Sequence, residues 1–362
     1  MMLSAFHRVC TTLVLLSPLL YGAVISFTTE VARAAEAATP IPHIALLLPL
    51  DSPSFGRHAD AVRQGFIAAA KRAEKNLPPI RVYAVNEDTL NVLAVYEQAI
   101  ESGAQLVVGP LTRDGVAALA ASSLVTVPTL ALNTLEPRSP QPARLYQFGL
   151  SIELEARQIA QLAFDDGRRN AFVISNDTPL SKRMRQAFVE EFARFGGMVV
   201  AEFGSGADQA SLSRLRNAAN LGVADSAFLA LDDIRASTVR PYLGNSLAVY
   251  ATSQVNAGRG ALEMRELNQV HFVDMPWILQ ADHPAVMVYP RQQFGNALDF
   301  DRLYALGIDA FRIGLEILRN NPEPLLDGVT GRIRLTRDQQ FVRELTAALF
   351  VDGKIVIQDA PR

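Results

Sequence analysis

The segment HIALLLPLDSPSFGRHADAVRQGFIAAAKRA, residues 43–73, contains the unit that decides the fold. Residues 44–48 are continuously apolar, as expected for a strand buried on both faces of a sheet. Residues 51–54 are polar and include a proline, which predicts a turn. Apolar side chains then recur at three- and four-residue spacing, the pattern of a helix packed on that strand: Ala59, Val62, Phe66, Ala69 and Ala73. The segment therefore predicts a strand, a loop and a helix.

The same alternation continues along the chain. Apolar or β-branched runs predict further strands at residues 80–85, 106–108, 129–132, 171–174, 198–203, 227–231 and 247–251. Helical stretches separate them, and Ser151 is a predicted helix cap with Glu153 in the first turn. Strands that alternate with helices are typical of parallel sheets covered by helices. We therefore predict an α/β fold with two doubly wound (Rossmann-like) lobes.

Length, composition and charge agree with this prediction. At 362 residues the chain exceeds the length at which a single core stops growing, which favours two lobes. Its 49% hydrophobic and 20% charged residues are typical of a folded chain. A formal net charge of -3 gives no global basic field for phosphates, which argues against nucleic acid as the main partner.

The N-terminal segment predicts export. His7 and Arg8 precede an apolar run over residues 9–27, and residues 32–34, Ala-Arg-Ala, provide a small-x-small cleavage site. We interpret residues 1–34 as a secretory signal peptide. An uncleaved membrane anchor is the alternative, because the apolar run is long enough to span a bilayer. The mature protein is expected to be periplasmic and soluble, since no later apolar run is long enough for a transmembrane segment.

The single cysteine, Cys10, lies at the start of the apolar run. A lipid-modified cysteine would follow that run at the cleavage point, so we expect no lipid anchor. After cleavage the chain would contain no thiol. This suits an oxidising compartment and excludes disulfides, cysteine–zinc sites and cysteine nucleophiles.

Polar loops after the predicted strands are the candidate ligand site. Open α/β sheets bind ligands at the carboxyl ends of their strands, and these loops recur in both halves of the chain. For any single residue, a role as helix cap or turn former is the simpler interpretation. The predicted cleft residues are Ser54, Phe55, Leu111, Thr112, Asn133 and Thr134 from the first lobe and Asn176, Asp177, Thr252, Ser253 and Gln254 from the second.

Catalytic and cofactor signatures are absent from the sequence. It has no Gly-x-Ser-x-Gly nucleophile elbow, Walker loop, dinucleotide glycine fingerprint or His-Glu-x-x-His metal helix. Adjacent carboxylates at Asp232 and Asp233 diverge after a strand and are interpreted as a helix cap. The histidines are scattered rather than paired at metal-ligand spacing. We therefore predict a non-enzymatic protein without metal or cofactor.

Several longer motifs resemble the LpoA/LppC family of penicillin-binding protein activators. They are VVGPLTRDGVAALA from Val107, VPTLALN from Val127, YQFGLSIELEARQIA from Tyr146, YATSQVNAG from Tyr250, ELNQVHFVDMPWIL from Glu266, LYALGIDAFRI from Leu303 and DGVTGRIRLTRDQQFVRELTAALFVDGK from Asp327. VVGPL alone occurs widely among type I binding proteins. The combination of VDMPWIL and GVTGRIRL after YATSQ is more specific.

The resemblance implies a type I periplasmic-binding-protein architecture with interleaved chain crossings. The crossings are expected near Gly149, Asp274 and Leu325. Lobe one would then contain residues 40–148 and 275–324, and lobe two residues 149–274 and 325–362. Family members in enteric bacteria are outer-membrane lipoproteins with an additional helical repeat domain. This chain is expected to be a short form, without that domain and without the lipid-bearing cysteine.

Two functions follow as alternatives. The resemblance implies a non-enzymatic envelope regulator that binds and activates a class A penicillin-binding protein in peptidoglycan synthesis. The fold alone equally allows a periplasmic receptor for a small polar ligand such as an amino acid, because one scaffold hosts many functions. Amino-acid receptors of this fold use a serine or threonine pair after a first-lobe strand for the ligand carboxylate and an acidic residue of the second lobe for the amine. Pro110 and Leu111 occupy one such loop, and the sequence shows no clear equivalent of the full set.

Overall fold

The first predicted unit forms as expected. In the computed structural model, β1 spans His43–Leu48 and α2 spans Gly56–Ala70. The structure describes residues 40–73, 76–136, 139, 141–206, 208–295, 297–321 and 324–358. The predicted signal peptide and Cys10 lie outside this described part of the chain.

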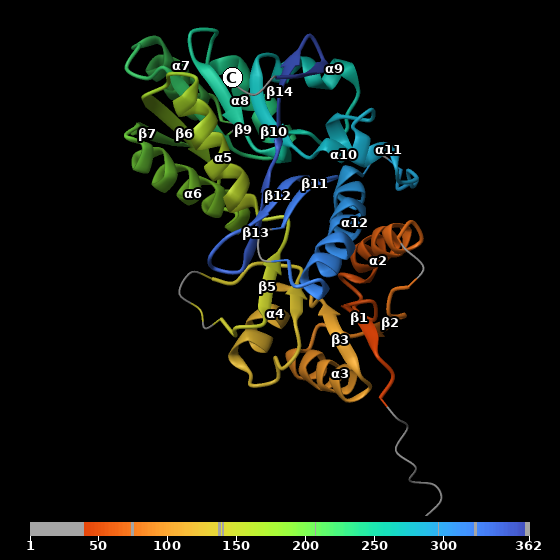
Figure 1. Ribbon diagram of the computed structural model, residues 1–362. Helices are drawn as coiled ribbons and strands as arrows, with labels where there is room; N and C mark the ends of the chain where they lie inside the picture. The colour runs from red at the N-terminus through yellow and green to blue at the C-terminus, as the bar shows by residue number, and fades with distance from the viewer. Residues whose placement is uncertain are drawn as a thin grey trace, which may run out of the picture. The chain divides into compact units, whose positions relative to one another are not determined.

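Eight strands of the described residues form the first sheet, in the order β11-β12-β13-β5-β4-β3-β1-β2 (Figure 1). The strands β2, β1, β3, β4 and β5 run parallel, β13 continues in parallel beside β5, and β12 and β11 add antiparallel strands at the edge. Besides β1, the strands are β2 (Ile80–Ala84), β3 (Ala104–Val108), β4 (Thr129–Ala131), β5 (Leu145–Phe148), β11 (Leu325–Gly328), β12 (Gly331–Leu335) and β13 (Gln340–Glu344).

Helices cover both faces of this sheet. Leu46 of β1 belongs to a core shared with α2 and α12, whereas its neighbour Leu47 belongs to a core shared with α3 and α4. Successive strand side chains point to opposite faces, so the continuous apolar run of β1 fills both cores. The helices of this lobe, besides α2, are α3 (Thr89–Glu101), α4 (Arg113–Ala121), α10 (Pro276–Leu279), α11 (Pro284–Met287) and α12 (Leu298–Leu318).

The second sheet has seven strands among the described residues, in the order β15-β14-β10-β9-β8-β6-β7. The five strands from β10 to β7 are parallel, and β14 and β15 are antiparallel to their neighbours. The strands are β6 (Asn170–Ser175), β7 (Met198–Gly204), β8 (Ser226–Ala230), β9 (Ala248–Ala251), β10 (Val270–Asp274), β14 (Thr346–Val351) and β15 (Lys354–Ile357).

Local sequence positions three helix ends of the second lobe. Ser151 caps α5 by accepting a hydrogen bond from the Leu154 amide, and Gly196 ends α6 in the left-handed conformation with φ 98°. Asp232 caps α8 in the same way as Ser151 caps α5, which confirms its structural interpretation. The elements are α5 (Ile152–Asp165), α6 (Pro179–Phe195), α7 (Gln209–Asn220), α8 (Asp233–Val239) and α9 (Ala261–Met264), with 3-10 turns η1 (Arg240–Tyr242), η2 (Ser253–Val255) and η3 (Arg265–Leu267).

The third passage of the chain between the sheets differs from the prediction. The chain leaves the first sheet after Phe148 and returns to it after Asp274. It then stays there through β11, β12 and β13 and passes to β14 at Leu345, not near Leu325. The assignment of residues 325–344 to lobe two was therefore wrong. The physical reason is backbone pairing, because β13 binds β5 in the register Phe341↔Phe148 and carries β12 and β11 with it.

We name the first sheet with its helices the first lobe, and the second sheet with its helices the second lobe. Both belong to one compact unit that begins at Pro42. Two doubly wound sheets confirm the predicted α/β class. Within the described residues, every helix is too short or too polar to cross a membrane.

Candidate functional site

A groove of about 820 Å³ lies where the two lobes meet, and both lobes line it. The first lobe contributes Arg113, Thr134 and Glu136 from the segments after β3 and β4, and Asp338 from the turn before β13. The second lobe contributes the first turns of α5 and residues 183–190 of α6. The lining contains charged groups of both signs and few apolar side chains. It is suited to binding a polar or charged group rather than an apolar one.

Helix starts position the charged side chains of this groove. Thr112 caps α4, which places Arg113 at the first helical position. Ser151 caps α5, and its hydroxyl also donates to Glu153 Oε2 at 2.9 Å. Thr178 caps α6 ahead of Arg183. The groove is thus lined by short segments at the start of helices, where local sequence controls the backbone geometry.

Glu153 links the two walls of the groove. Its Oε1 accepts a hydrogen bond from Arg113 Nη2 at 2.8 Å and lies 3.5 Å from Arg183 Nε. Burial acts to raise the pKa of Glu153, but hydrogen bonds from its own backbone amide and from Arg113 outweigh burial, so its pKa is lowered. The carboxylate therefore stays ionised and holds one arginine from each lobe.

Of the eleven predicted cleft residues, Thr134 lines this groove and the other ten do not. Asn176 and Asp177 line a separate cavity of about 500 Å³ within the second lobe, together with Lys182, Arg185 and Arg235. The predicted cleft residues thus do not line one common cavity in the structure. A role for these residues in ligand binding stays a prediction.

In the first lobe, the predicted residues make turn and cap contacts, partly through backbone amides and partly through side chains. The backbone amide of Ser54 donates to Glu87, and Phe55 directly precedes α2 with its amide donating to Ser52 Oγ. Asn133 Nδ2 donates to the carbonyl oxygen of Leu111 at 3.0 Å. These contacts are turn and cap interactions, as the simpler interpretation of each residue predicts.

The second-lobe residues are likewise engaged. Asn176 Oδ1 accepts from Thr178, and Asp177 pairs with Lys182 at 3.5 Å. Thr252 is buried, and its Oγ1 accepts from the backbone amide of Gln254 at 3.4 Å. Asn176 and Thr252 thus use side-chain oxygens within the chain, whereas the Asp177 carboxylate stays exposed.

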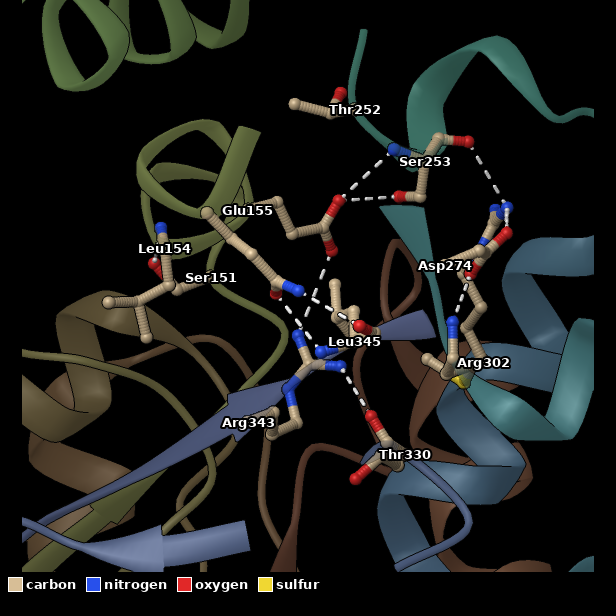
Figure 2. Close-up of polar contacts among 12 residues, drawn as sticks. Ser151, Leu154, Glu155, Thr252, Ser253, Asp274, Arg302, Thr330, Arg343 and Leu345 are labelled. Carbon is tan, nitrogen blue, oxygen red and sulfur yellow. Dashed lines mark hydrogen bonds and ion pairs between the residues drawn. The ribbon is translucent and has the colours of Figure 1, made fainter. Parts of the chain in front are cut away.

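The structure also shows a buried charged cluster that the sequence analysis missed (Figure 2). Its members are Glu155 of α5, Asp274 at the end of β10, Arg302 of α12 and Arg343 of β13, and none exceeds 9% exposure. They come from four elements that are far apart in sequence. The sequence shows that these four residues are charged, but their spacing along the chain gives no sign that they meet.

The two halves of the cluster differ in how well the charges are compensated. Arg302 binds Asp274 through two bonds, Nη2 to Oδ2 at 2.7 Å and Nε to Oδ1 at 3.2 Å. Arg343 Nη2 lies 3.7 Å from Glu155 Oε1, and Arg343 Nε has no hydrogen-bond partner. Glu155 Oε2 also accepts from the amide and hydroxyl of Ser253, at 3.2 and 2.7 Å.

The pKa shifts follow the same asymmetry. Burial acts to lower the pKa of Arg302, but the Asp274 charge outweighs it and the pKa is raised. Burial lowers the pKa of Arg343 and raises that of Glu155, and their mutual attraction only partly offsets this. The Arg302–Asp274 pair is thus well compensated, whereas the Glu155–Arg343 pair is not.

The described residues hold no cluster of three or more histidine, cysteine, aspartate or glutamate side chains arranged for a metal. The histidines that the sequence analysis found scattered lie apart in the structure as well. His43 lies beside Tyr83 in the first sheet, whereas His271 stacks on Tyr250 in the second. The groove and the buried charged cluster are the two polar features where the lobes meet.

Comparison with known proteins shows which family the chain belongs to. The sequence matches the family model described as "LppC putative lipoprotein" over residues 29–353. The chain belongs to the LppC family. This confirms the resemblance deduced from the sequence motifs.

Curated LppC relatives are longer than this chain. A protein of Pantoea ananatis named "Penicillin-binding protein activator LpoA" is 28% identical over 324 residues, which cover 76% of this chain and 47% of the relative. A protein of the same name from Yersinia pseudotuberculosis is 25% identical over 415 residues, which cover 91% and 62%. The chain therefore spans about half of the length of the curated relatives it matches.

Solved structures confirm the type I periplasmic-binding-protein fold. A Chromobacterium violaceum structure, described as "a putative branched-chain amino acid ABC transporter", is 37% identical with TM-score 0.74 and covers 86% of this chain and 100% of its own. The C-domain of LpoA from Haemophilus influenzae, described as "a regulator of PBP1A", is 24% identical with TM-score 0.74 and covers 88% of this chain and 100% of its own. The predicted architecture is thus shared by both kinds of relative.

Proposed function

We propose that this LppC-family chain is a non-enzymatic regulator in the bacterial cell envelope, which binds a class A penicillin-binding protein and raises its activity in peptidoglycan synthesis. Relatives over most of the chain carry the name penicillin-binding protein activator. Activation would be a population shift, in which the regulator binds the active conformation of the synthase more tightly than the inactive one.

The observation that supports this function best is that three of the predicted ligand-binding side chains form hydrogen bonds within the chain. Asn133 binds the Leu111 carbonyl, Thr112 caps α4 and Ser253 binds Glu155. A receptor for a small polar ligand needs free donors and acceptors in its cleft, because displacing such internal bonds costs free energy. A regulator that binds another protein through its surface has no such requirement.

One observation favours a solute receptor as the second candidate. The 37% identical structure from Chromobacterium violaceum is described as belonging to branched-chain amino acid transport. The groove between the lobes is also large enough for a small molecule, within the usual 300–1,000 Å³ of ligand pockets. Under this alternative the chain would bind a free amino acid and deliver it to a transporter.

A reconstituted synthesis assay tests the proposal. The mature chain is added to a lipid-linked peptidoglycan precursor together with the class A penicillin-binding protein of the same organism, and glycan polymerisation and crosslinking are measured. We expect a faster reaction with the chain present and no turnover by the chain alone. Absence of stimulation, together with tight calorimetric binding of a branched-chain amino acid, would transfer the assignment to the receptor.

A further inference from the structure

The three passages of the chain between the lobes all lie beside the buried cluster. Glu155 follows the first passage on α5, Asp274 is the last residue of β10 at the second, and Arg343 precedes the third passage at Leu345. In a two-lobed protein, relative motion of the lobes is concentrated in a few such connecting residues. Rotation of one lobe against the other would therefore change the distances within the cluster.

The charges are divided between the lobes by sign. Both arginines belong to the first lobe, Arg302 on α12 and Arg343 on β13, and both carboxylates belong to the second, Glu155 on α5 and Asp274 on β10 (Figure 2). Each ion pair therefore joins one lobe to the other. Rotation of the lobes would separate each pair, and breaking a buried ion pair is strongly unfavourable.

Other contacts fix each member within its own lobe or to the facing backbone. Glu155 is held in the second lobe by two hydrogen bonds from Ser253. Arg302 extends beyond Asp274 and donates to the carbonyl oxygen of Asn256 at 2.8 Å. One turn beyond Glu155 on α5, Gln158 binds both backbone groups of Leu345, its amide donating at 2.8 Å and its oxygen accepting at 3.0 Å. The third passage is thereby fastened to α5.

We propose that the Glu155–Arg343 and Arg302–Asp274 pairs form a lock that fixes the orientation of the two lobes, so that the groove keeps one width. Neutral packing of the same site would stabilise it equally or better, so buried pairs are best understood here as specifying one geometry. The inference does not depend on the identity of the partner. It implies that the chain presents a rigid surface and does not close over a ligand by rotation of its lobes.

The lock is tested by measuring a distance across the groove. Spin labels are attached at Glu136→Cys in the first lobe and Glu190→Cys in the second, both on the groove wall, with Cys10 replaced by serine in the full chain. Double electron–electron resonance then reports the distance distribution. We expect one narrow distribution in this background, and a shifted and broadened one after Arg343→Met.

Two further variants show whether a broadened distribution comes from loss of the inter-lobe pairs, from partial unfolding or from loss of any charge. Because Arg343→Met leaves Glu155 buried without its partner, the double variant E155M/R343M is made as a folded reference and checked by circular dichroism. We expect it to unfold at a temperature near that of the parent and still to show the broadened distribution. Arg63→Met removes a half-exposed ion pair within α2 and should leave the distribution narrow.

A broad distribution in the parent chain would overturn the lock, as would a narrow one in the folded double variant. Equal broadening by Arg63→Met would also overturn it, because the effect would then not be specific to the inter-lobe pairs. The measurement contains no synthase. A failure of the synthesis assay therefore leaves the lock standing, and a failure of the lock leaves the proposed regulator standing.

Discussion

Gly65 of α2 and Gly307 of α12 lie at a helix crossing where the backbones touch. A Cβ atom on Gly65 would lie 1.9 Å from the carbonyl oxygen of Tyr304, and one on Gly307 would lie 2.0 Å from that of Val62. Each glycine therefore faces the backbone of the other helix. This contact closes the core that α2 and α12 form on the first sheet (Figure 1).

Gly307→Ala is expected to destabilise the protein, because the added methyl group overlaps backbone atoms that cannot rotate away. Overpacking of this kind costs about 1–3 kcal/mol in the free energy of unfolding. Urea denaturation followed by circular dichroism measures it. Gly204→Ala is the matched control, since a Cβ there meets no atom within 4 Å. Equal stability of the two variants would contradict the crossing.

Arg302→Met is expected to be more destabilising than loss of a surface ion pair. It leaves Asp274, which is 1% exposed, without its guanidinium partner, and breaking a buried pair costs about 3–5 kcal/mol. Arg63→Met removes the half-exposed pair within α2 and should lower the free energy of unfolding by less than about 1 kcal/mol. Thermal unfolding of the two variants gives the comparison, and similar losses would show that the cluster is not compensated as described.

Cleft substitutions are expected to spare synthase stimulation. Gln254→Ala and Thr112→Ala alter predicted cleft residues that lie outside the groove lining. Thr112→Ala also removes the α4 cap and should cost about 1 kcal/mol of stability. If the chain acts through a docking surface, both variants should stimulate the synthase like the parent. Loss of stimulation by folded Gln254→Ala would contradict action through a docking surface away from these loops.

Stability is expected to fall on mild acidification because of His271. Burial lowers the pKa of His271 below its ordinary 6.5, and the hydrogen bond with Gln358 and the Asp166 charge only partly oppose this. Between the lowered pKa and 6.5 the unfolded chain binds more protons than the folded chain, so stability is present above pH 6.5 and is lost as the pH falls through this window. Denaturation midpoints across pH 5–8 test this, and His271→Gln should reduce the slope.

The sequence analysis recovered elements whose cause is local. The apolar run of β1, the stripe of α2, the Ser151 cap and the Asp232 cap each depend on residues close together in the chain. It did not predict β5, β10 or β11–β15. Of these, β13 pairs with β5, nearly two hundred positions earlier, and β12 and β11 follow it in the sheet, so their place depends on contacts that the local sequence does not show. The crossing near Leu325 was implied by the family resemblance alone, and the structure has this passage at Leu345.

The sequence by itself determined the fold class, the family and the caps of α5 and α8, because periodicity, caps and motifs act over a few residues. Only the tertiary structure decided the site. Thr134 lines the groove, whereas Thr112, similar in type and placement, does not, and its hydroxyl caps α4 instead. The pairing of Glu155 with Arg343 was equally unreadable, since burial and proximity between distant residues arise only when both sheets have formed.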